Sequence, residues 1–221
     1  MFKDRKQAAK MLSEKLNKYK NASGAIIAAP KEGVIIGYEL AEELNLPLDI
    51  ILVEQIGHPF NRQFTAGSVS LSGVVIDEHI DMPVEYLEKE IMDAREILIN
   101  RYKLYLPFRK PISLKNKSVI ITCDGIASGN TLFLTVIQLV KESNPAEIIV
   151  AVPVASPQIT EKILESADEF IFLSAQEDFS EVSRYYEKSE QADDEDVIFL
   201  LKEANNSSEN KYCNNSNRRG L

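Results

Sequence analysis

The residues best suited to chemistry stand together between a predicted strand and a predicted helix. Asp124 follows the apolar run Val119-Ile120-Ile121, and apolar residues return at helical spacing from Leu132 to Val140. Glycines let a backbone turn tightly and approach a ligand, and the first amide groups of a helix lack partners within the helix. The intervening segment therefore predicts an anion site that suits phosphate. Its residues are Gly125, Ile126, Ala127, Ser128, Gly129, Asn130 and Thr131.

Two interpretations of this segment remain open. In the simpler one, the glycines serve only the geometry of a strand-to-helix turn, because a single glycine-rich loop is weakly specific. Asp124 favours a sugar phosphate instead. Its carboxylate can accept hydrogen bonds from hydroxyls or hold magnesium, while backbone amides hold the phosphate.

Strands and helices alternate along the chain and predict the α/β class. Because strands separated by helices form a parallel sheet, ligands are expected at the carboxyl ends of the strands. Residues 63–70 and 73–76 predict a small antiparallel excursion. Strands are expected near 24–29, 49–53, 119–121, 148–152 and 170–173, and helices near 5–19, 34–44, 83–104, 132–140, 158–166 and 193–204.

Length and composition predict one domain with a short tail. The chain has 221 residues, of which 44% are hydrophobic, enough to bury a full core over residues 1–204. Residues 205–221 are rich in Asn and Ser and almost without apolar side chains, so we expect a disordered tail there.

Charge and hydropathy exclude several classes of partner. The formal charge of −9, with no long Lys/Arg stripe, argues against nucleic acid. No uncharged run is long enough to span a bilayer and no apolar segment follows the basic N-terminus, so we expect a soluble cytoplasmic protein without membrane contact. Two cysteines, Cys123 and Cys213, suggest neither a disulfide framework nor a structural zinc site.

The segment around Asp124 resembles the phosphoribosyl-diphosphate signature of type I phosphoribosyltransferases, in which a strand leads into two acids and a small loop. The chain as a whole resembles a branch of predicted phosphoribosyltransferases with no established acceptor. Phe2-Lys3-Asp4-Arg5 matches the start of that branch, Pro30-Lys31-Glu32-Gly33-Val34 its turn after the first strand, and Ala151-Val152-Pro153-Val154-Ala155 a later strand.

This resemblance implies the type I phosphoribosyltransferase fold and a site for phosphoribosyl diphosphate with Mg²⁺. Asp124 would contact ribose hydroxyls and the metal as the catalytic acid, with Cys123 at the ribose edge of the site. Residues 125–131 would bind the 5-phosphate, and Pro30, Lys31, Glu32 and Gly33 would form the pyrophosphate loop. The partner would be a small phosphosugar or nucleotide, and a homodimer is left open. Ala127 disfavours a purine acceptor, since purine-salvage relatives carry an acid there.

Several positions depart from the family pattern. Cys123 replaces one of the paired acids, Glu32 replaces a glycine, and Glu54 and Gln55 replace two cations. A nucleophilic or redox role for Cys123 is disfavoured, because no histidine or second cysteine is placed by the sequence to assist it. Two functions therefore remain: a transferase with an unknown acceptor, or a catalytically degenerate relative that binds a phosphosugar or nucleotide in a regulatory role.

Overall fold

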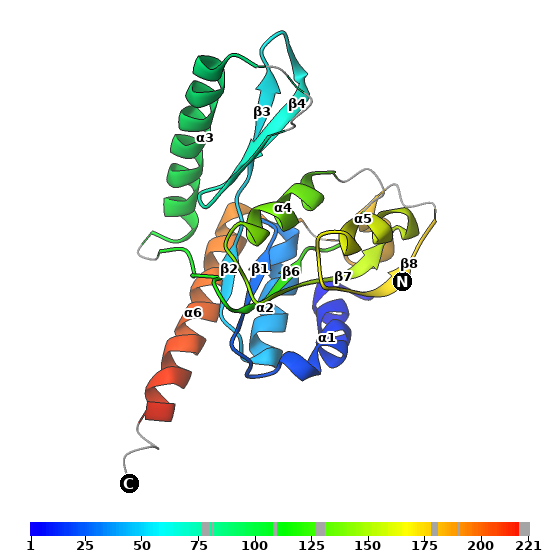
Figure 1. Cartoon of the computed structure of the whole chain (residues 1–221). Helices are drawn as coiled ribbons and strands as arrows, with labels where there is room; N and C mark the ends of the chain where they lie inside the picture. The colour runs from blue at the N-terminus through cyan, green and yellow to red at the C-terminus, as the bar shows by residue number, and fades with distance from the viewer. Residues whose placement is uncertain are drawn as a thin grey trace.

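The computed structural model describes residues 1–76, 80, 82–107, 110–126, 131–177, 181–189 and 191–216. For residues 61–65, 131–132 and 207–216 it describes the backbone alone. The predicted α/β class is confirmed: a parallel sheet of five strands lies between helices, and a small antiparallel sheet adjoins it (Figure 1).

The central sheet has the strand order β2-β1-β6-β7-β8, with every neighbouring pair parallel. Ile26 pairs with Leu48 on one side and Ile120 on the other, which makes β1 an interior strand. Apolar side chains on both faces suit strands that helices cover on both sides. The strands are β1 (Gly24–Ala28), β2 (Leu48–Ile50), β6 (Ser118–Thr122), β7 (Glu147–Ala155) and β8 (Glu169–Ala175).

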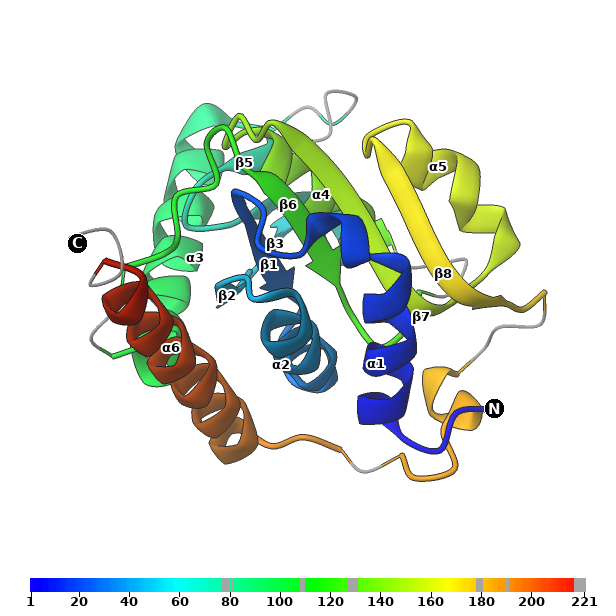
Figure 2. The ribbon, with the colours of Figure 1, turned by 90° about the horizontal axis from the view of Figure 1, so that it is seen from below.

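Two hydrophobic cores lie on the two faces of this sheet. Ile26 and Ile120 point into the core that contains residues of α1, α2 and α6, and these helices lie on the near face in Figure 2. Ile27 and Ile121 point into the other core, with residues of α4 and α5. The helices are α1 (Arg5–Lys15), α2 (Glu32–Leu44), α3 (Val84–Tyr105), α4 (Thr131–Lys141), α5 (Thr160–Leu164) and α6 (Asp194–Ser216), with short 3-10 turns η1 (Asn17–Tyr19), η2 (Pro157–Ile159) and η3 (Val182–Tyr185).

The antiparallel excursion is also confirmed, and it contains a strand that the sequence did not predict. β4 (Asn61–Val69) pairs with β3 (Glu54–His58) on one side and β5 (Val74–Ile76) on the other. The polar Glu54 and Gln55 give β3 no clear hydrophobic alternation, so its strand character depends on pairing with β4. β3, β4 and α3 lie above the parallel sheet in the view of Figure 1.

The last helix is longer than the sequence predicts. α6 does not end near Ala204 but continues to Ser216, into the segment whose composition predicts disorder. Val197, Leu201 and Ala204 are buried. Tertiary packing therefore stabilises the first turns of the helix, and successive backbone hydrogen bonds extend it from there. No helix in the described part of the chain is long and apolar enough to cross a membrane.

Candidate active site

The carboxyl ends of β1 and β6 bring the two predicted loops together. Ala28 is in register with Thr122, and the Ala29 amide donates to the Thr122 carbonyl at 2.9 Å. Gly33 lies so close to the second loop that a Cβ there would be 3.2 Å from the Cα of Cys123. The predicted pyrophosphate loop and the predicted ribose site are therefore neighbours at one edge of the sheet.

The turn at residues 30–33 is strained where α2 begins. Lys31, the residue before the helix, has φ 65° and ψ −114°, a conformation that residues other than glycine rarely adopt. Such conformations cost about 1 to 3 kcal/mol and persist where the surroundings enforce them. Pro30 and Lys31 are exposed and Glu32 is half-buried, so the loop can be reached by a ligand at the positive end of the α2 dipole.

On its other side, the predicted phosphate loop is held by β7. The Ile126 amide donates to the Val154 carbonyl at 3.0 Å, and the Ser156 amide donates to the Ile126 carbonyl at 2.9 Å. Ile126 itself is fully buried, so its side chain belongs to the core. Residues 127–130 of the predicted cradle lie outside the described residues, and Thr131 begins α4.

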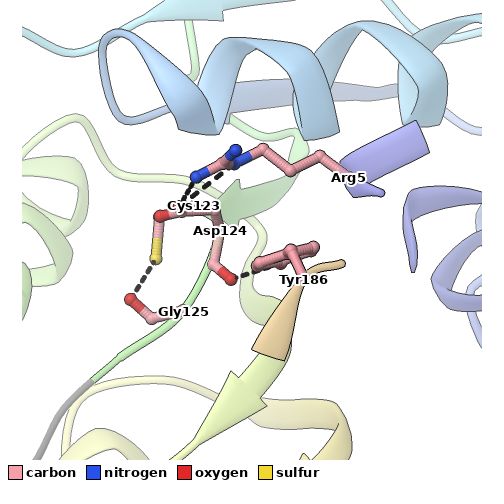
Figure 3. Close-up of polar contacts among 5 residues, drawn as sticks. All are labelled: Arg5, Cys123, Asp124, Gly125 and Tyr186. Atoms are coloured by element: carbon pink, nitrogen blue, oxygen red, sulfur yellow. Dashed lines mark hydrogen bonds and ion pairs between the residues drawn. The ribbon is translucent and has the colours of Figure 1, made fainter. Parts of the chain in front are cut away.

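Asp124 is held by an arginine from the N-terminal helix (Figure 3). Nε and Nη2 of Arg5 both donate to Oδ2 of Asp124, at 3.2 and 2.9 Å. The two side chains are only 7% and 18% exposed. Desolvation by burial raises the pKa of the Asp124 carboxyl; Arg5 opposes that shift and the charge of Glu32 adds to it.

Tyr186 completes the surroundings of this ion pair. Its hydroxyl donates to the backbone carbonyl of Asp124 at 2.6 Å, and the Arg5 guanidinium lies 4.9 Å from the centre of its ring. Burial, and then the charge of Asp124, raise the pKa of the Tyr186 phenol, so it stays a neutral donor. The ring of Phe2 lies 5.8 Å from that of Tyr186, and the Phe2 amide donates to the Tyr185 carbonyl at 2.8 Å. Arg5, at the start of α1, and Tyr186, directly after η3, thus both contact Asp124.

Sequence reasoning gave Arg5 and Tyr186 no role in the site. A signal for Arg5 is present, because Arg5, Ala8, Ala9 and Leu12 lie at helical spacing and all are buried. A charged residue on the apolar face of a helix needs a buried partner. Nothing in the spacing of Tyr186 reveals its contact with Asp124, which lies 62 residues away.

Cys123 faces the core more than the candidate site. Its side chain packs with Ile126, Val119 and other residues on the α4 face, and its Sγ donates to the Gly125 carbonyl at 3.3 Å (Figure 3). Burial, and then the charge of Asp124, raise the pKa of the thiol far above its ordinary value, so it stays neutral. A neutral, buried thiol suits packing and not nucleophilic attack.

The two positions at which the expected family pattern has cations, Glu54 and Gln55, both lie on β3. Oε1 of Glu54 is 2.7 Å from Nη1 of Arg101 on α3. Arg101 is thus engaged by a carboxylate from β3. Tyr105, on the same helix, donates to Asp194 at 2.8 Å and so links α3 to α6; burial and this hydrogen bond raise the pKa of Tyr105 to about 12.

The described residues do not fit a magnesium ion held by the chain itself. Magnesium prefers several oxygen ligands in octahedral geometry. Asp124 is already engaged by Arg5, and the neighbouring thiol of Cys123 is a poor ligand for a hard cation. No cluster of three or more Asp, Glu, His or Cys residues suited to a metal occurs in the described part of the chain.

The chain is similar to a solved protein in fold and to curated proteins in sequence over most of its length. The protein TT1426 from Thermus thermophilus superposes with a TM-score of 0.80 at 32% identity, over 91% of this chain and 98% of that one. In Mycobacterium tuberculosis, a protein named "Putative phosphoribosyl transferase" in two strains is 27% identical over 209 residues, 92% of this chain and 47% of its own length. The chain thus spans about half the length of the curated relatives it matches.

The family model described as "Phosphoribosyl transferase domain" matches residues 2–189. That range begins with Phe2 and ends just after Tyr186, so it includes every residue described around Asp124. The expected resemblance is thereby confirmed, and the chain belongs to the phosphoribosyl transferase domain family.

Proposed function

We propose that this chain binds a phosphoribosyl ligand at the carboxyl edge of β1 and β6 and transfers the phosphoribosyl group to a small acceptor. One observation carries the proposal: Gly33 approaches Cys123 so closely that a Cβ on Gly33 would lie 3.2 Å from the Cys123 Cα, which brings the α2 N-terminus near Asp124. A ligand with a ribose between two phosphate groups could reach both loops at once. In this arrangement Asp124 accepts from ribose hydroxyls and the loop before α4 holds the 5-phosphate.

Transfer of a phosphoribosyl group depends on the positioning of the ligand more than on acid–base groups. Displacement of pyrophosphate from ribose C1 passes through an oxocarbenium-like state, so the site must align the ligand and stabilise the departing negative charge. The amide groups at the start of α2, together with the Lys31 side chain, are suited to the departing diphosphate. Magnesium would enter with the diphosphate of the ligand, because the chain has no cage for it among its described residues.

A degenerate, regulatory binding protein is the second candidate, and specific observations favour it. Glu32 puts negative charge close enough to Asp124 to act on its pKa, in the loop that should receive pyrophosphate. The Cys123 side chain contributes no second carboxylate. Binding without turnover is the consequence expected from these two changes.

Calorimetry and a pyrophosphate-release assay distinguish the candidates. Phosphoribosyl diphosphate, ribose 5-phosphate and nucleoside monophosphates are titrated with and without magnesium, and a panel of acceptors is screened for pyrophosphate release. Binding with release supports the transferase, and binding without release across the panel supports the regulatory protein. Absence of binding by every ligand contradicts both.

A further inference from the structure

The pair of Arg5 and Asp124 is built into the fold and is not a surface contact. Arg5 is the first residue of α1, and its side chain is 7% exposed. Two of its N–H groups converge on one carboxylate oxygen, Oδ2. The ring of Tyr186 lies against the guanidinium, and the Tyr186 hydroxyl donates a hydrogen bond to the backbone carbonyl of Asp124. Arg5 is therefore fixed on Asp124 by its planar donors, by burial and by an aromatic neighbour.

The charges around Asp124 indicate what the ion pair with Arg5 does. Arg5 neutralises the carboxylate of Asp124, and Glu32 is the other acid that acts on Asp124 electrostatically. The Cys123 side chain adds no charge, because its thiol is buried and donates to a carbonyl. A site with two free carboxylates would need a cation to remain stable, since adjacent like charges repel. Here the cation is already present as a side chain.

We propose that the Arg5 guanidinium takes the role of a bound cation at Asp124, so that this chain binds the ribose 5-phosphate group without a magnesium ion held by its own residues. Arg5 orients and neutralises the carboxylate from one edge. The remaining acceptor positions of the carboxylate then receive ribose hydroxyls. This inference rests on the proposed function, since it concerns the same ligand site.

Ribose 5-phosphate is the probe that isolates this effect, because it lacks the diphosphate that chelates magnesium in solution. It is titrated by calorimetry into the full chain in EDTA and in excess magnesium. We expect the dissociation constant of the wild type to change by less than about twofold between the two conditions. Arg5→Met should weaken binding in EDTA by about tenfold or more, the range for losing a charged hydrogen bond. Magnesium should restore part of that loss, since the released carboxylate can then meet the metal.

Lys6→Met is the matched control. Lys6 is the next residue of the same helix, but its side chain is 68% exposed and its Nζ lies 3.9 Å from Glu39. Removing that charge should leave both titrations unchanged. Should Arg5→Met fail to fold, the two wild-type titrations still decide the inference, because they need no variant.

The contrary results are distinct. If magnesium tightens wild-type binding of ribose 5-phosphate more than about tenfold, or if Arg5→Met binds like the wild type in EDTA, the inference is wrong while the proposed function stands. If the wild type binds neither ribose 5-phosphate nor phosphoribosyl diphosphate, both the proposed function and this inference are wrong.

Discussion

At the scale of single residues, the candidate site depends on how burial alters the charge of Asp124. Its carboxylate is held at 2.9 Å by Arg5 and is largely removed from water. Burial is the largest of the influences on its pKa, ahead of the arginine. The ion pair therefore contributes more to orienting the carboxylate than to stabilising the fold, because removing two charges from water is costly.

Asp124→Asn tests this view through pH. The folded-state pKa of Asp124 lies above the value of about 3.9 found in an unfolded chain, so the folded protein holds this proton more tightly. The stability that it contributes is complete below about pH 4 and is lost as the pH rises through the folded pKa. Asn cannot titrate. The melting temperature of Asp124→Asn minus that of the wild type should therefore become more positive between pH 4 and pH 7. A constant difference over that range would contradict the raised pKa.

Cys123→Asp is expected to lower stability. The side chain is 6% exposed and its thiol donates to the Gly125 carbonyl, whereas an ionised carboxylate can only accept. An uncompensated buried charge costs on the order of 3 kcal/mol or more, measurable by urea denaturation. Cys123→Ser keeps a donor of similar size and should cost about 1 kcal/mol. If Cys123→Asp is as stable as the wild type, its carboxylate has turned away from the core, and the paired acids of the family pattern are restored.

At the level of elements, α3 connects the antiparallel strands to the rest of the fold through one ion pair and several tyrosine hydrogen bonds. Arg101 joins α3 to β3 through Glu54, and Tyr86 donates to the Gly57 carbonyl at 2.9 Å. Tyr105 joins α3 to α6. The buried Asp49 of β2 accepts a hydrogen bond from the Tyr102 hydroxyl of α3 at 3.1 Å and another from the Ile112 amide at 2.7 Å. These contacts set where α3 stands relative to the parallel sheet.

A double-mutant cycle on Glu54 and Arg101 tests the link between β3 and α3. The side chains are 27% and 44% exposed, so their coupling should be about 0.2 to 1 kcal/mol by urea denaturation and should fall with added salt. The exchanged pair, Glu54→Arg with Arg101→Glu, should retain stability close to that of the wild type. No coupling at low salt would mean that the contact at 2.7 Å contributes nothing to the placement of α3.

In the molecule as a whole, the N-terminal residues form backbone hydrogen bonds with the segment before α6, close to the candidate site. The Glu187 amide donates to the Phe2 carbonyl at 2.9 Å, and the Lys188 amide donates to the Lys3 carbonyl at 3.0 Å. The two ends of the region that matches the family model therefore lie side by side, close to Asp124. α6 follows this closure and packs its first turns onto α2 and α3.

Deletion of residues 207–221 tests how much of α6 the fold needs. The buried residues Val197, Leu201 and Ala204 all precede the cut, and Asn and Ser are weak helix formers. The melting temperature should shift by less than about 3 °C, and binding of ribose 5-phosphate should not change. Leu201→Ala is the contrasting variant, since loss of a buried leucine costs about 2 to 5 kcal/mol. A large shift on deletion would show that the last turns of α6 dock on the fold.

The α/β class, the parallel sheet and the edge at which the candidate site lies could be predicted from the sequence. These follow from local patterns: apolar runs as long as strands, helical periodicity between them, and glycines where β6 meets its loop. The resemblance to type I phosphoribosyltransferases implied that the segments at Pro30 and Asp124 belong to one site, and the structure brings these segments together at the carboxyl ends of β1 and β6. The small antiparallel sheet was predicted as well, but not β3, whose strand character comes from pairing and not from its own residues.

Which side chains meet depends on tertiary packing. Arg5 and Asp124 are 119 residues apart, and their contact depends on how α1 packs against α2 and the sheet. The same holds for Tyr186, for the pair of Glu54 with Arg101, and for the direction in which the Cys123 side chain points. Periodicity gives the buried face of each element, but charge pairing across elements depends on rotation and spacing that only packing fixes. The positions of the candidate site residues could therefore be predicted from the sequence, whereas the side chains that contact Asp124 are given by the tertiary structure.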